Sequence, residues 1–475
     1  MQSRRDQVQA HRFVVGRLTS GILGADPDMP ETPLARTSRG VFIGALLGLL
    51  AIAVSAIFGL LVPSKSTKWR TARSLIIVKE SGARYVYVNG TLHQVLNYAS
   101  AVLLIGGTSA TTVPASALNG VPRGAPIGIP GAPDELPRAT KLGGERPWRV
   151  CAGQNGADSE PLTSMLIDVP DFPQVLPAGQ GVLVGVAENA TYLLWQGKRY
   201  RMPEDRASLG ALGYADARVR RVDAAFLNAV PAGPDLAAPP VPGRGGDGPR
   251  IAGQPTKVGQ LFVLAGSGQT YVLTTGGLRP VTRTQQALLL AHPDTAKLAY
   301  GGAAPVTREL DAGELTTHAD PVRYDEIGLP PAPPELVRPG GVEAVCLLVQ
   351  PFGDAPRYGV YLTDADTLGG HPVIVPESVI PSCAPADKVV VGPTGGAVVR
   401  VLSSSGLSRN GRLYLITPTG IKYPMTGAGA QTLGYSAVTA TAIPHALLDA
   451  LPTGPLLDAS AVRSGARGFP VEGCV

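Results

Sequence analysis

The sequence GVFIGALLGLLAIAVSAIFGLLV at residues 40–62 contains no charged side chain and only one serine. A helix over these residues is about 34 Å long at 1.5 Å per residue, and the hydrocarbon core of a bilayer is about 30 Å thick. No second stretch of similar length and apolar purity follows. The chain is therefore expected to cross a membrane once, with most of its mass in one body.

Two other structures could contain such a stretch. A buried core helix is rarely apolar on every face with basic residues close to both ends. A cleavable signal peptide has a short basic leader and an A-x-A-like exit, whereas residues 1–39 precede this span and no such site follows it. An uncleaved signal anchor is favoured. The flanking charges point against a cytosolic head, because two basic residues precede the span and four follow it, but long domains translocate largely regardless of such charges. These residues are Arg36 and Arg39 before the span, and Lys65, Lys68, Arg70 and Arg73 after it.

The four cysteines indicate on which side of the membrane the body lies. Cys151, Cys346, Cys383 and Cys474 all follow the span, and no two of them form a C-x-x-C pair. An even number of widely spaced cysteines suits a disulfide-forming compartment better than a zinc site. The body is thus predicted to lie outside the cytoplasm, the alternative being four buried thiols in a cytosolic body. Three pairings are allowed, and the residues do not choose among them.

Composition favours a folded body without naming its function. The chain has 59 glycines and 45 prolines, which is typical of many short strands joined by turns. Charged residues make up 16% and aromatic residues 5%, and the net charge of +5 is thinly spread. Neither a nucleic-acid groove nor a disordered tail is indicated. A body of this size exceeds one hydrophobic core, so two or more subdomains are expected.

An internal repeat organises the body. NATYLLWQGKRYRM and ALGYADARVRRVDAAFLNAVPAGPDL within residues 189–236 correspond to NGRLYLITPTGIKYPM and TLGYSAVTATAIPHALLDALPTGPLL within 410–457. A third copy reads ARYVYVNGTLHQV at 83–95 and VPASALNGVPRG at 113–124. A fourth, QTYVLTTGGLRPV at 269–281, keeps the opening and is expected to lack the closing half. Chance likeness between glycine- and proline-rich segments remains an alternative for this fourth copy.

Each copy is predicted to form a ββαβα unit of about 45 residues. In residues 189–236, two strands joined at Gly197 precede a short helix ended by Gly213, a third strand, and a last helix capped by Asp223. A unit this small must pack on a neighbour or on a shared centre. Strand-like runs in the segments between copies suggest a central domain assembled from them. The predicted structural positions of the repeats are Gly90, Gly197, Gly276, Gly420, Tyr200, Tyr423, Pro122, Pro231 and Pro452.

The sequence contains no recognised motif for catalysis or for metal or cofactor binding. It has no phosphate-binding G-x-x-x-x-G-K-[ST], no H-E-x-x-H, no G-x-S-x-G, and no G-x-G-x-x-G that opens a helix. The six histidines are far apart and show no ligand spacing. No cofactor, metal or catalytic residue is therefore predicted, and the body is expected to function through contacts.

Residues 1–39 are predicted to be a cytosolic segment that contains a short amphipathic helix. The sequence Ser3-Arg-Arg-Asp6 resembles a capping box, and Gly24 and Pro27 would end the helix. One apolar stripe contains Val8, Val15, Leu18 and Ile22. Such a helix could lie on an anionic inner membrane surface or bind a cytosolic partner; a partly ordered tail is the alternative.

The opening RRDQVQAHRFVVGRLTSGILGADPD, the single span near residue 40 and the repeat ending L-N-x-x-P-x-G-P resemble the EccB family. These proteins are membrane components of the type VII (ESX) secretion system of actinobacteria. The resemblance covers essentially the whole chain. It implies a plasma-membrane protein with a cytosolic N-terminus and one periplasmic domain. This exterior domain would contain four repeats around a central core. The copy at 269–281 departs from the pattern by its lost ending.

The resemblance also implies partners and a disulfide. Expected partners are EccC, EccD, EccE and the mycosin protease, together with inner membrane lipid and further copies of the chain, but no nucleic acid. A core disulfide maps onto Cys151 and Cys346, which leaves Cys383 and Cys474 as a second possible pair.

The expected fold is α+β: a short amphipathic helix, one transmembrane helix, and an elongated body of ββαβα repeats around a mainly β core. The predicted boundaries are 1–39 for the cytosolic segment, 40–62 for the span, 63–125 for the stalk and repeat 1, 140–188 for the first core segment, 189–238 for repeat 2, 239–257 for a flexible linker, 258–305 for repeat 3, 306–396 for the second core segment, 397–458 for repeat 4, and 459–475 for a tail.

The predicted function is a non-enzymatic scaffold that oligomerises outside the inner membrane and supports protein export. ATP hydrolysis, suggested for the family, is the main alternative and would require a phosphate-binding loop and acidic metal ligands. A membrane-tethered cell-wall-binding module is the second. It would require stacking aromatics at matching repeat positions, where Tyr200 and Tyr423 match but His93 and Arg279 do not.

Overall fold

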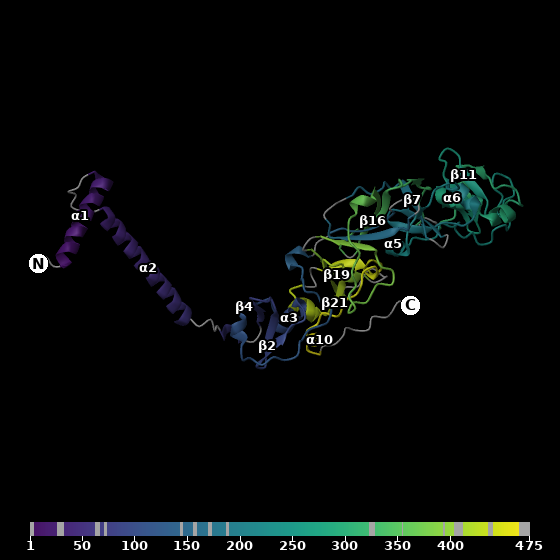
Figure 1. Ribbon diagram of the computed structural model, residues 1–475. Helices are drawn as coiled ribbons and strands as arrows, with labels where there is room; N and C mark the ends of the chain where they lie inside the picture. The colour runs from purple at the N-terminus through teal and green to yellow at the C-terminus, as the bar shows by residue number, and fades with distance from the viewer. Residues whose placement is uncertain are drawn as a thin grey trace. The chain divides into compact units, whose positions relative to one another are not determined.

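The computed structural model describes residues 4–25, 33–61, 67–70, 74–142, 146–154, 159–169, 173–186, 190–322, 328–353, 355–392, 395–402, 412–435 and 440–464. They form two units, one of residues 1–71 with 113–120 and one of residues 72–112 with 121–475. Figure 1 shows that long helices dominate the first unit and small sheets the second. The chain is therefore of mixed α and β structure.

Two long helices dominate the first unit (Figure 1). The elements of this unit are α1 (Arg4–Gly24), α2 (Pro33–Leu61) and the 3-10 turns η1 (Thr67–Arg70) and η2 (Ala115–Leu118). Within the described residues, Thr37–Ile57 of α2 is the single stretch long and apolar enough to cross a membrane, and none of it is buried. The helix starts earlier than residue 40, at a proline, which suits the first turn of a helix.

Four small sheets make up most of the second unit. Their strands are β1 (Leu75–Val78), β2 (Arg84–Val88), β3 (Thr91–Gln94) and β4 (Ala110–Val113); β7 (Gln180–Gly185), β8 (Thr191–Trp195), β9 (Lys198–Arg201) and β10 (Arg220–Arg221); β11 (Leu261–Leu264), β12 (Thr270–Thr274), β13 (Gly277–Val281) and β14 (Thr307–Leu310); and β19 (Ala397–Leu402), β20 (Leu413–Ile416), β21 (Lys422–Met425) and β22 (Thr441–Pro444).

All four sheets have the same strand order, with the third strand at one edge, then the second, the first and the fourth. The first three strands pair antiparallel in each sheet. The fourth strand pairs parallel to the first in the sheets of β7, β11 and β19. The ββαβα prediction therefore omitted one strand: the first strand of each sheet precedes the hairpin that the repeat pattern revealed.

A fifth sheet forms the centre of the unit, in the order β17-β16-β5-β6-β18. Its strands are β5 (Trp148–Gly153), β6 (Leu162–Ile167), β16 (Glu343–Gln350), β17 (Arg357–Asp364) and β18 (Lys388–Val391). They come from two segments of the chain that are separated by two of the small sheets. One face packs in the cluster of Val150, Val345 and Leu347, and the other in that of Cys151, Cys346 and Tyr361.

Short helices follow the strands. They are α3 (Tyr98–Ile105), α4 (Arg206–Ala211), α5 (Ala224–Ala229), α6 (Arg283–Ala291), the π-helical turn η4 (Thr295–Ala299), α7 (Ala312–His318), α8 (Gly427–Thr432), α9 (His445–Asp449) and α10 (Ala459–Ser464), with 3-10 turns η3 (Ala139–Lys141) and η6 (Ala365–Thr367). Side-chain caps start several of them, as Asp223 does by accepting the Phe226 N–H at 2.8 Å.

The helices join the sheets in pairs. The helix after the third strand packs on its counterpart, α3 on α8 and α4 on α6, while the closing helices α5 and α9 contact each other. The cluster of Val102, Leu415 and Tyr435 thus joins helix α3 to the fourth sheet, and that of Leu193, Tyr214 and Leu288 joins helix α6 to the second sheet. Leu227 and Leu448 lie in the same cluster as the central sheet.

Several predicted boundaries are wrong. Strand β7 falls within residues 140–188, predicted as the first core segment, but it pairs with β8 in a small sheet. Repeat 3 does not lose its closing half: β14 and α7 supply it beyond residue 305, after an insertion that contains η4. Residues 239–257 are not a flexible linker, because Val241 and Ile251 are buried and a bridge joins Asp247 to Lys257.

Candidate functional site

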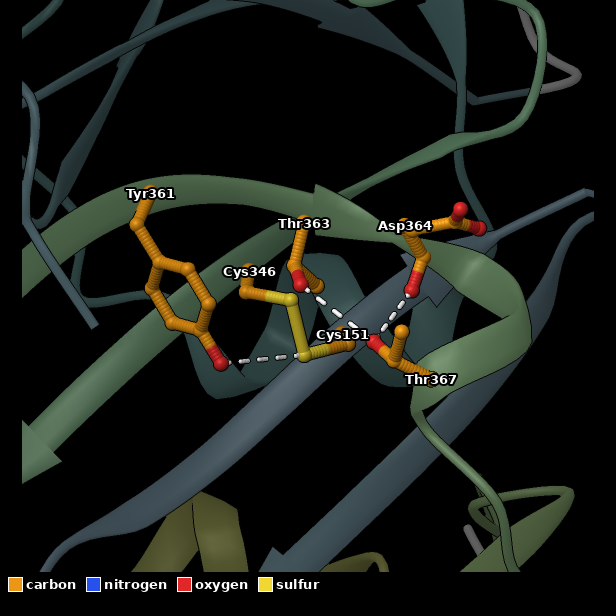
Figure 2. Close-up of a disulfide and its surroundings, with 6 residues drawn as sticks. All are labelled: Cys151, Cys346, Tyr361, Thr363, Asp364 and Thr367. Carbon is orange, nitrogen blue, oxygen red and sulfur yellow. Dashed lines mark hydrogen bonds between the residues drawn. A yellow bond between two sulfur atoms is a disulfide. The ribbon is translucent and has the colours of Figure 1, made fainter. Parts of the chain in front are cut away.

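A disulfide joins β5 and β16, two neighbouring inner strands of the central sheet. Cys151 of β5 lies directly opposite Cys346 of β16 in the antiparallel register, and their sulfurs are 2.06 Å apart. Both cysteines are 0% exposed. Figure 2 shows the Tyr361 hydroxyl beside the bridge, 3.6 Å from Cys151 Sγ. Cys383 is also disulfide-bonded, whereas Cys474 lies outside the described residues.

The register around this disulfide is symmetric. Ala152 pairs with Val345 on one side of the two cysteines, and Val150 pairs with Leu347 on the other. Any antiparallel pair of strands has this two-fold relation, but here each strand is also the first strand of a hairpin. The hairpin partners extend the pattern, with β6 beside β5 and β17 beside β16. The cross-link thus joins equivalent positions of two strands that are 195 residues apart in sequence.

Two matching segments flank the centre. IGIPGAPDELPR at 127–138 follows the first small sheet, and IGLPPAPPELVR at 327–338 follows the third. The hydroxyl of buried Tyr435 donates to the Pro137 carbonyl at 2.6 Å, and that of buried Tyr214 donates to the Pro334 carbonyl at 2.7 Å. Burial raises the pKa of both phenols. Each of the two similar segments thus accepts a hydrogen bond from a buried tyrosine, although Pro137 and Pro334 are not corresponding positions in them.

Both tyrosines lie in the matching repeat stretches ALGYADARV and TLGYSAVTA, but they are not among the predicted structural positions. The likeness of 127–138 to 327–338 was the signal that could have identified them. It appears only when the segments between the repeats are compared with one another, rather than with the repeats. The segment 327–338, which follows the third sheet, also contributes strand β15 (Glu335–Leu336), which pairs with β7 of the second sheet.

A proline and a glycine close the first sheet. The Leu92 N–H donates to the Pro122 carbonyl at 2.8 Å, and the Gly124 N–H donates to the Leu92 carbonyl at 2.9 Å. Proline is suited to this position, because only its carbonyl is required. The segment after the closing helix is thereby held against the third strand, which protects that edge of the sheet.

The second and fourth sheets close in the same way. The Arg199 N–H donates to the Pro231 carbonyl, and the Gly233 N–H donates to the Arg199 carbonyl, at 2.8 Å each. The Lys422 N–H donates to the Pro452 carbonyl at 3.0 Å, and the Gly454 N–H donates to the Lys422 carbonyl at 2.8 Å. The predicted positions Pro122, Pro231 and Pro452 therefore share one structural task, which is to accept the third-strand N–H.

An aromatic ring covers each of these glycines. A Cβ on Gly233 would lie 2.6 Å from Tyr200 Cε1, and one on Gly454 would lie 2.2 Å from Tyr423 Cε1. His93 covers Gly124 with a corresponding gap of 2.3 Å. Since real Cβ atoms do not approach other atoms so closely, the signature requires glycine. Tyr200 and Tyr423 are consequently buried against their own sheet.

Replacing Gly233 with alanine is expected to destabilise the body by about 1–3 kcal/mol, because the new methyl group must displace the Tyr200 ring. The free energy of unfolding in urea measures this loss. Gly210→Ala in the same repeat is the matched control: no atom lies within 4 Å of the position that its methyl group would take, and alanine favours the helix, so a gain of about 0.5–1 kcal/mol is expected. Equal effects of the two variants would contradict the packing argument.

The third sheet closes with an ion pair instead. Asp320 occupies the position of the glycine, and its N–H donates to the Leu278 carbonyl at 3.0 Å. Arg279 occupies the position of the ring, with Nη2 2.7 Å from Asp320 Oδ2. Burial of the carboxyl opposes ionisation, but hydrogen bonds from the Val322 N–H, Thr274 and Arg279 lower the pKa of Asp320 below its usual value. The third sheet therefore keeps the backbone hydrogen bond that closes the other sheets, but an ion pair replaces the contact between ring and glycine.

The hairpin glycines behave alike at three of four positions. Gly90, Gly197 and Gly420 have φ of 82°, 73° and 76°, which favours glycine. Gly276 is an exception, because the positive φ of this turn, 122°, belongs to Gly277. The turn at Gly197 also abuts the central sheet: a Cβ there would lie 2.2 Å from Tyr358 Cβ on β17.

A cation caps the closing helix in the second and fourth sheets. Arg199 Nη1 donates to the Leu227 carbonyl of α5 at 2.6 Å, and Lys422 Nζ donates to the Leu448 carbonyl of α9. Basic side chains at a helix C-terminus satisfy its last carbonyls. Burial lowers the pKa of Lys422 from 10.5 to about 8, against the opposing charge of Asp449.

This buried lysine predicts a pH-dependent stability. The folded chain holds the proton of Lys422 less tightly than the unfolded chain does, so unfolding takes up a proton between pH 8 and 10.5. The contribution of Lys422 to the free energy of unfolding is therefore expected to rise across that window, by about 3 kcal/mol in total relative to a variant that does not titrate there. Lys422→Arg, which copies the second sheet, should abolish the rise because arginine stays protonated. An unchanged slope in that variant would refute the assignment.

One open groove lies beside the second sheet. It has a volume of about 580 Å³ and is lined by Leu183, Tyr214 and Leu336, with Arg218 and Arg338 among the charged residues at its walls. Asp216 and Glu335 line it as well, so its charge is mixed. Among the described residues, no group of three or more His, Cys, Asp or Glu side chains could hold a metal ion.

Comparison with known proteins places the chain in a family. The model for "Type VII secretion system ESX-1, transport TM domain B" matches residues 1–470. The chain is 29% identical to "ESX-3 secretion system ATPase EccB3" of Mycobacterium tuberculosis, over 95% of this chain and 88% of the relative. It is 26% identical to "ESX-1 secretion system ATPase EccB1" of the same organism, over 96% and 93%.

Solved structures agree with these matches. A chain of the "EccB3 dimer from the ESX-3 core complex" superposes with a TM-score of 0.65 at 26% identity, over 82% of this chain and 99% of that one. A chain of an intact ESX-5 inner membrane complex has the same fold, with a TM-score of 0.65 at 22% identity over 100% and 98%. The family model covers nearly the whole sequence, and the chain belongs to the EccB family of type VII secretion membrane proteins.

Proposed function

We propose that this protein is a structural core component of a type VII secretion membrane complex. In this proposal α2 spans the inner membrane, residues 1–39 lie in the cytoplasm, and the body lies on the exterior side. The disulfide at the centre of the body is the observation that carries the proposal, because such bonds persist in oxidising compartments and are rare in the cytosol. A single candidate spanning helix precedes it within the described part of the chain.

The orientation can be tested by labelling intact cells with a membrane-impermeant maleimide. A cysteine introduced at exposed Asp216 should react, whereas one at exposed Val8 should react only after the membrane is permeabilised. Each variant is the other's control, since both side chains reach solvent in the folded chain. Labelling of intact cells at residue 8 and not at residue 216 would show that the chain has the opposite orientation.

The body is proposed to consist of four copies of one β-β-β-α-β-α unit, arranged as two halves. Each half has two small sheets, one of the matching segments 127–138 or 327–338, and a central hairpin. The shared strand order supports this, as does the pairing of the hairpins β5–β6 and β16–β17 through their first strands. Such a body offers several faces held at fixed spacing, which is what a scaffold for protein export requires.

The proposed partners are EccC, EccD, EccE, the mycosin protease, inner membrane lipid, and further copies of the chain through the exterior domain. Relatives support assembly in general terms, since their structures are described as an ESX-5 inner membrane complex and as an EccB3 dimer. Blue-native electrophoresis of gently solubilised membranes tests the proposal. Migration within a megadalton-scale assembly is expected, and migration as a lone chain would overturn it.

ATP hydrolysis is a second candidate function, because relatives carry "ATPase" in their names. The scaffold proposal expects the purified chain to hydrolyse ATP no faster than a buffer control. Turnover that a single point substitution abolishes would establish the enzymatic alternative instead.

The cell-wall-binding alternative is weakened by packing. It required exposed aromatic rings at matching repeat positions, but Tyr200 is 2% exposed and Tyr423 4%. Rings that cover a glycine of their own sheet present no face for a sugar to stack on.

A further inference from the structure

We propose that His292 is a pH-sensitive latch that fastens the glycine-rich segment 243–248 to the end of α6 at neutral pH and releases it in acid. His292 caps the C-terminus of α6, the helix that packs on α4 of the second sheet. The latch, defined as the contact of His292 with Arg244, therefore sits where the second and third sheets meet.

The geometry at the ring assigns its protonation state. Arg244 Nη1 lies 2.8 Å from His292 Nδ1, and the Asp294 N–H donates to the same nitrogen at 3.2 Å. A guanidinium has donors only, so Nδ1 must accept with its lone pair. The imidazole is consequently neutral in this arrangement, with its proton on Nε2.

The segment that the latch holds is packed rather than loose. The Gly245 N–H donates to the Val258 carbonyl at 2.8 Å, and the Gly248 N–H to the Thr256 carbonyl at 2.9 Å. A Cβ on Gly245 would lie 2.9 Å from Leu298 Cβ in η4, the turn that follows His292. Contacts this close tie the position of the segment to that of the helix end.

Protonation would exchange the ring's partners. An imidazolium carries a proton on Nδ1, which would then face the Arg244 guanidinium, donor against donor and cation against cation. Two carboxylates act on the ring from other elements, Asp294 beyond α6 and Asp205 at the N-cap of α4. The neutral ring is thus bound to the segment 243–248, and the charged ring is drawn towards the carboxylates.

The surroundings keep the latch closed near pH 7. Burial and the charge of Arg244 lower the pKa of His292 below 6.5, while Asp294 and Asp205 oppose the shift. A histidine whose pKa is lowered in the folded state contributes stability that is lost as the pH falls from about 6.5 through the folded-state pKa. Acid therefore opens the latch.

Hydrogen exchange of the full-length chain in detergent tests this. After correction for intrinsic rates, the amides of Gly245, Gly248 and Val258 are expected to exchange at least about tenfold faster once the pH, lowered stepwise from 7.5, has passed through the folded-state pKa of His292, because their hydrogen bonds involve the held segment or the segment paired with it. Unchanged protection in the wild-type chain would overturn the proposal.

Three variants separate the latch from general acid sensitivity. His292→Asn places Oδ1 near the position of Nδ1 and cannot titrate, so protection should be equal at every pH of the series. His318→Asn, in the same repeat but paired with Glu314, should keep the wild-type response. Asp205→Asn retains an N-cap while removing a carboxylate, so opening should move to lower pH. A wild-type response in His292→Asn, or no displacement in Asp205→Asn, would refute the assignment.

Discussion

A chain in which Cys151 and Cys346 are both replaced by alanine is expected to lose about 2–5 kcal/mol of unfolding free energy. The cross-link joins residues 195 apart in sequence, so the unfolded chain gains the conformational freedom of a long loop when it is removed. Both side chains are fully buried at the centre of the sheet, so their removal also leaves small voids.

Urea unfolding of the full-length chain under oxidising conditions measures this loss. Adding a reductant to the wild-type chain should reproduce most of it, whereas the same reductant should have little further effect at this site in the double-alanine variant. Replacing both cysteines avoids a single unpaired thiol in the body. Equal unfolding midpoints for wild-type and variant chains would show that packing alone holds the two halves together.

Asp320→Ala is expected to cost about 3–5 kcal/mol, because it strips a buried ion pair of one partner. The carboxylate accepts from Arg279 at 2.7 Å and from Thr274 Oγ1 at 2.8 Å, and it also accepts the Val322 N–H at 2.9 Å. Its side chain is only 3% exposed, so water replaces few of these bonds. The loss should be read from the unfolding free energy at pH 7.

The other sheets suggest a matched rescue. Asp320→Gly combined with Arg279→Tyr copies the glycine and ring of the second sheet, and it is expected to recover much of the stability that either single substitution loses. A double-mutant cycle then measures the coupling, for which more than about 1 kcal/mol is expected. Additive effects of the two substitutions would mean that the ion pair does not stand in for the ring and glycine.

Local patterns could be read directly from the sequence. The apolar run at residues 40–62 lies largely within α2, and the helix predicted to end at Gly24 corresponds to α1, because hydrophobic periodicity acts within a few residues. The predicted capping box begins at Ser3, which lies outside the described residues. The hairpin at Gly197 and the capped helix after Asp223 were visible for the same reason. Their signals lie in turn and cap residues whose conformational preferences are local.

Contacts between distant residues escaped sequence reasoning. Strand β7 carries no repeat signature, and only its pairing with β8 shows that it belongs to a small sheet rather than to the core. The closing half of the third sheet was overlooked because an insertion displaced it and because Asp320 stands where the signature has glycine. Segment 239–257 has a linker's composition but has buried apolar side chains of its own.

The sequence by itself determined the candidate membrane span, the repeated hairpins and the proline-glycine endings, since each depends on the chemistry of neighbouring residues. Tertiary structure alone decided that the endings close sheet edges under a ring or an ion pair, and that Cys151 and Cys346 meet at the centre of a symmetric register. These features require groups far apart in the chain to come together, and the free energy of that meeting comes from burial and pairing that no local pattern records.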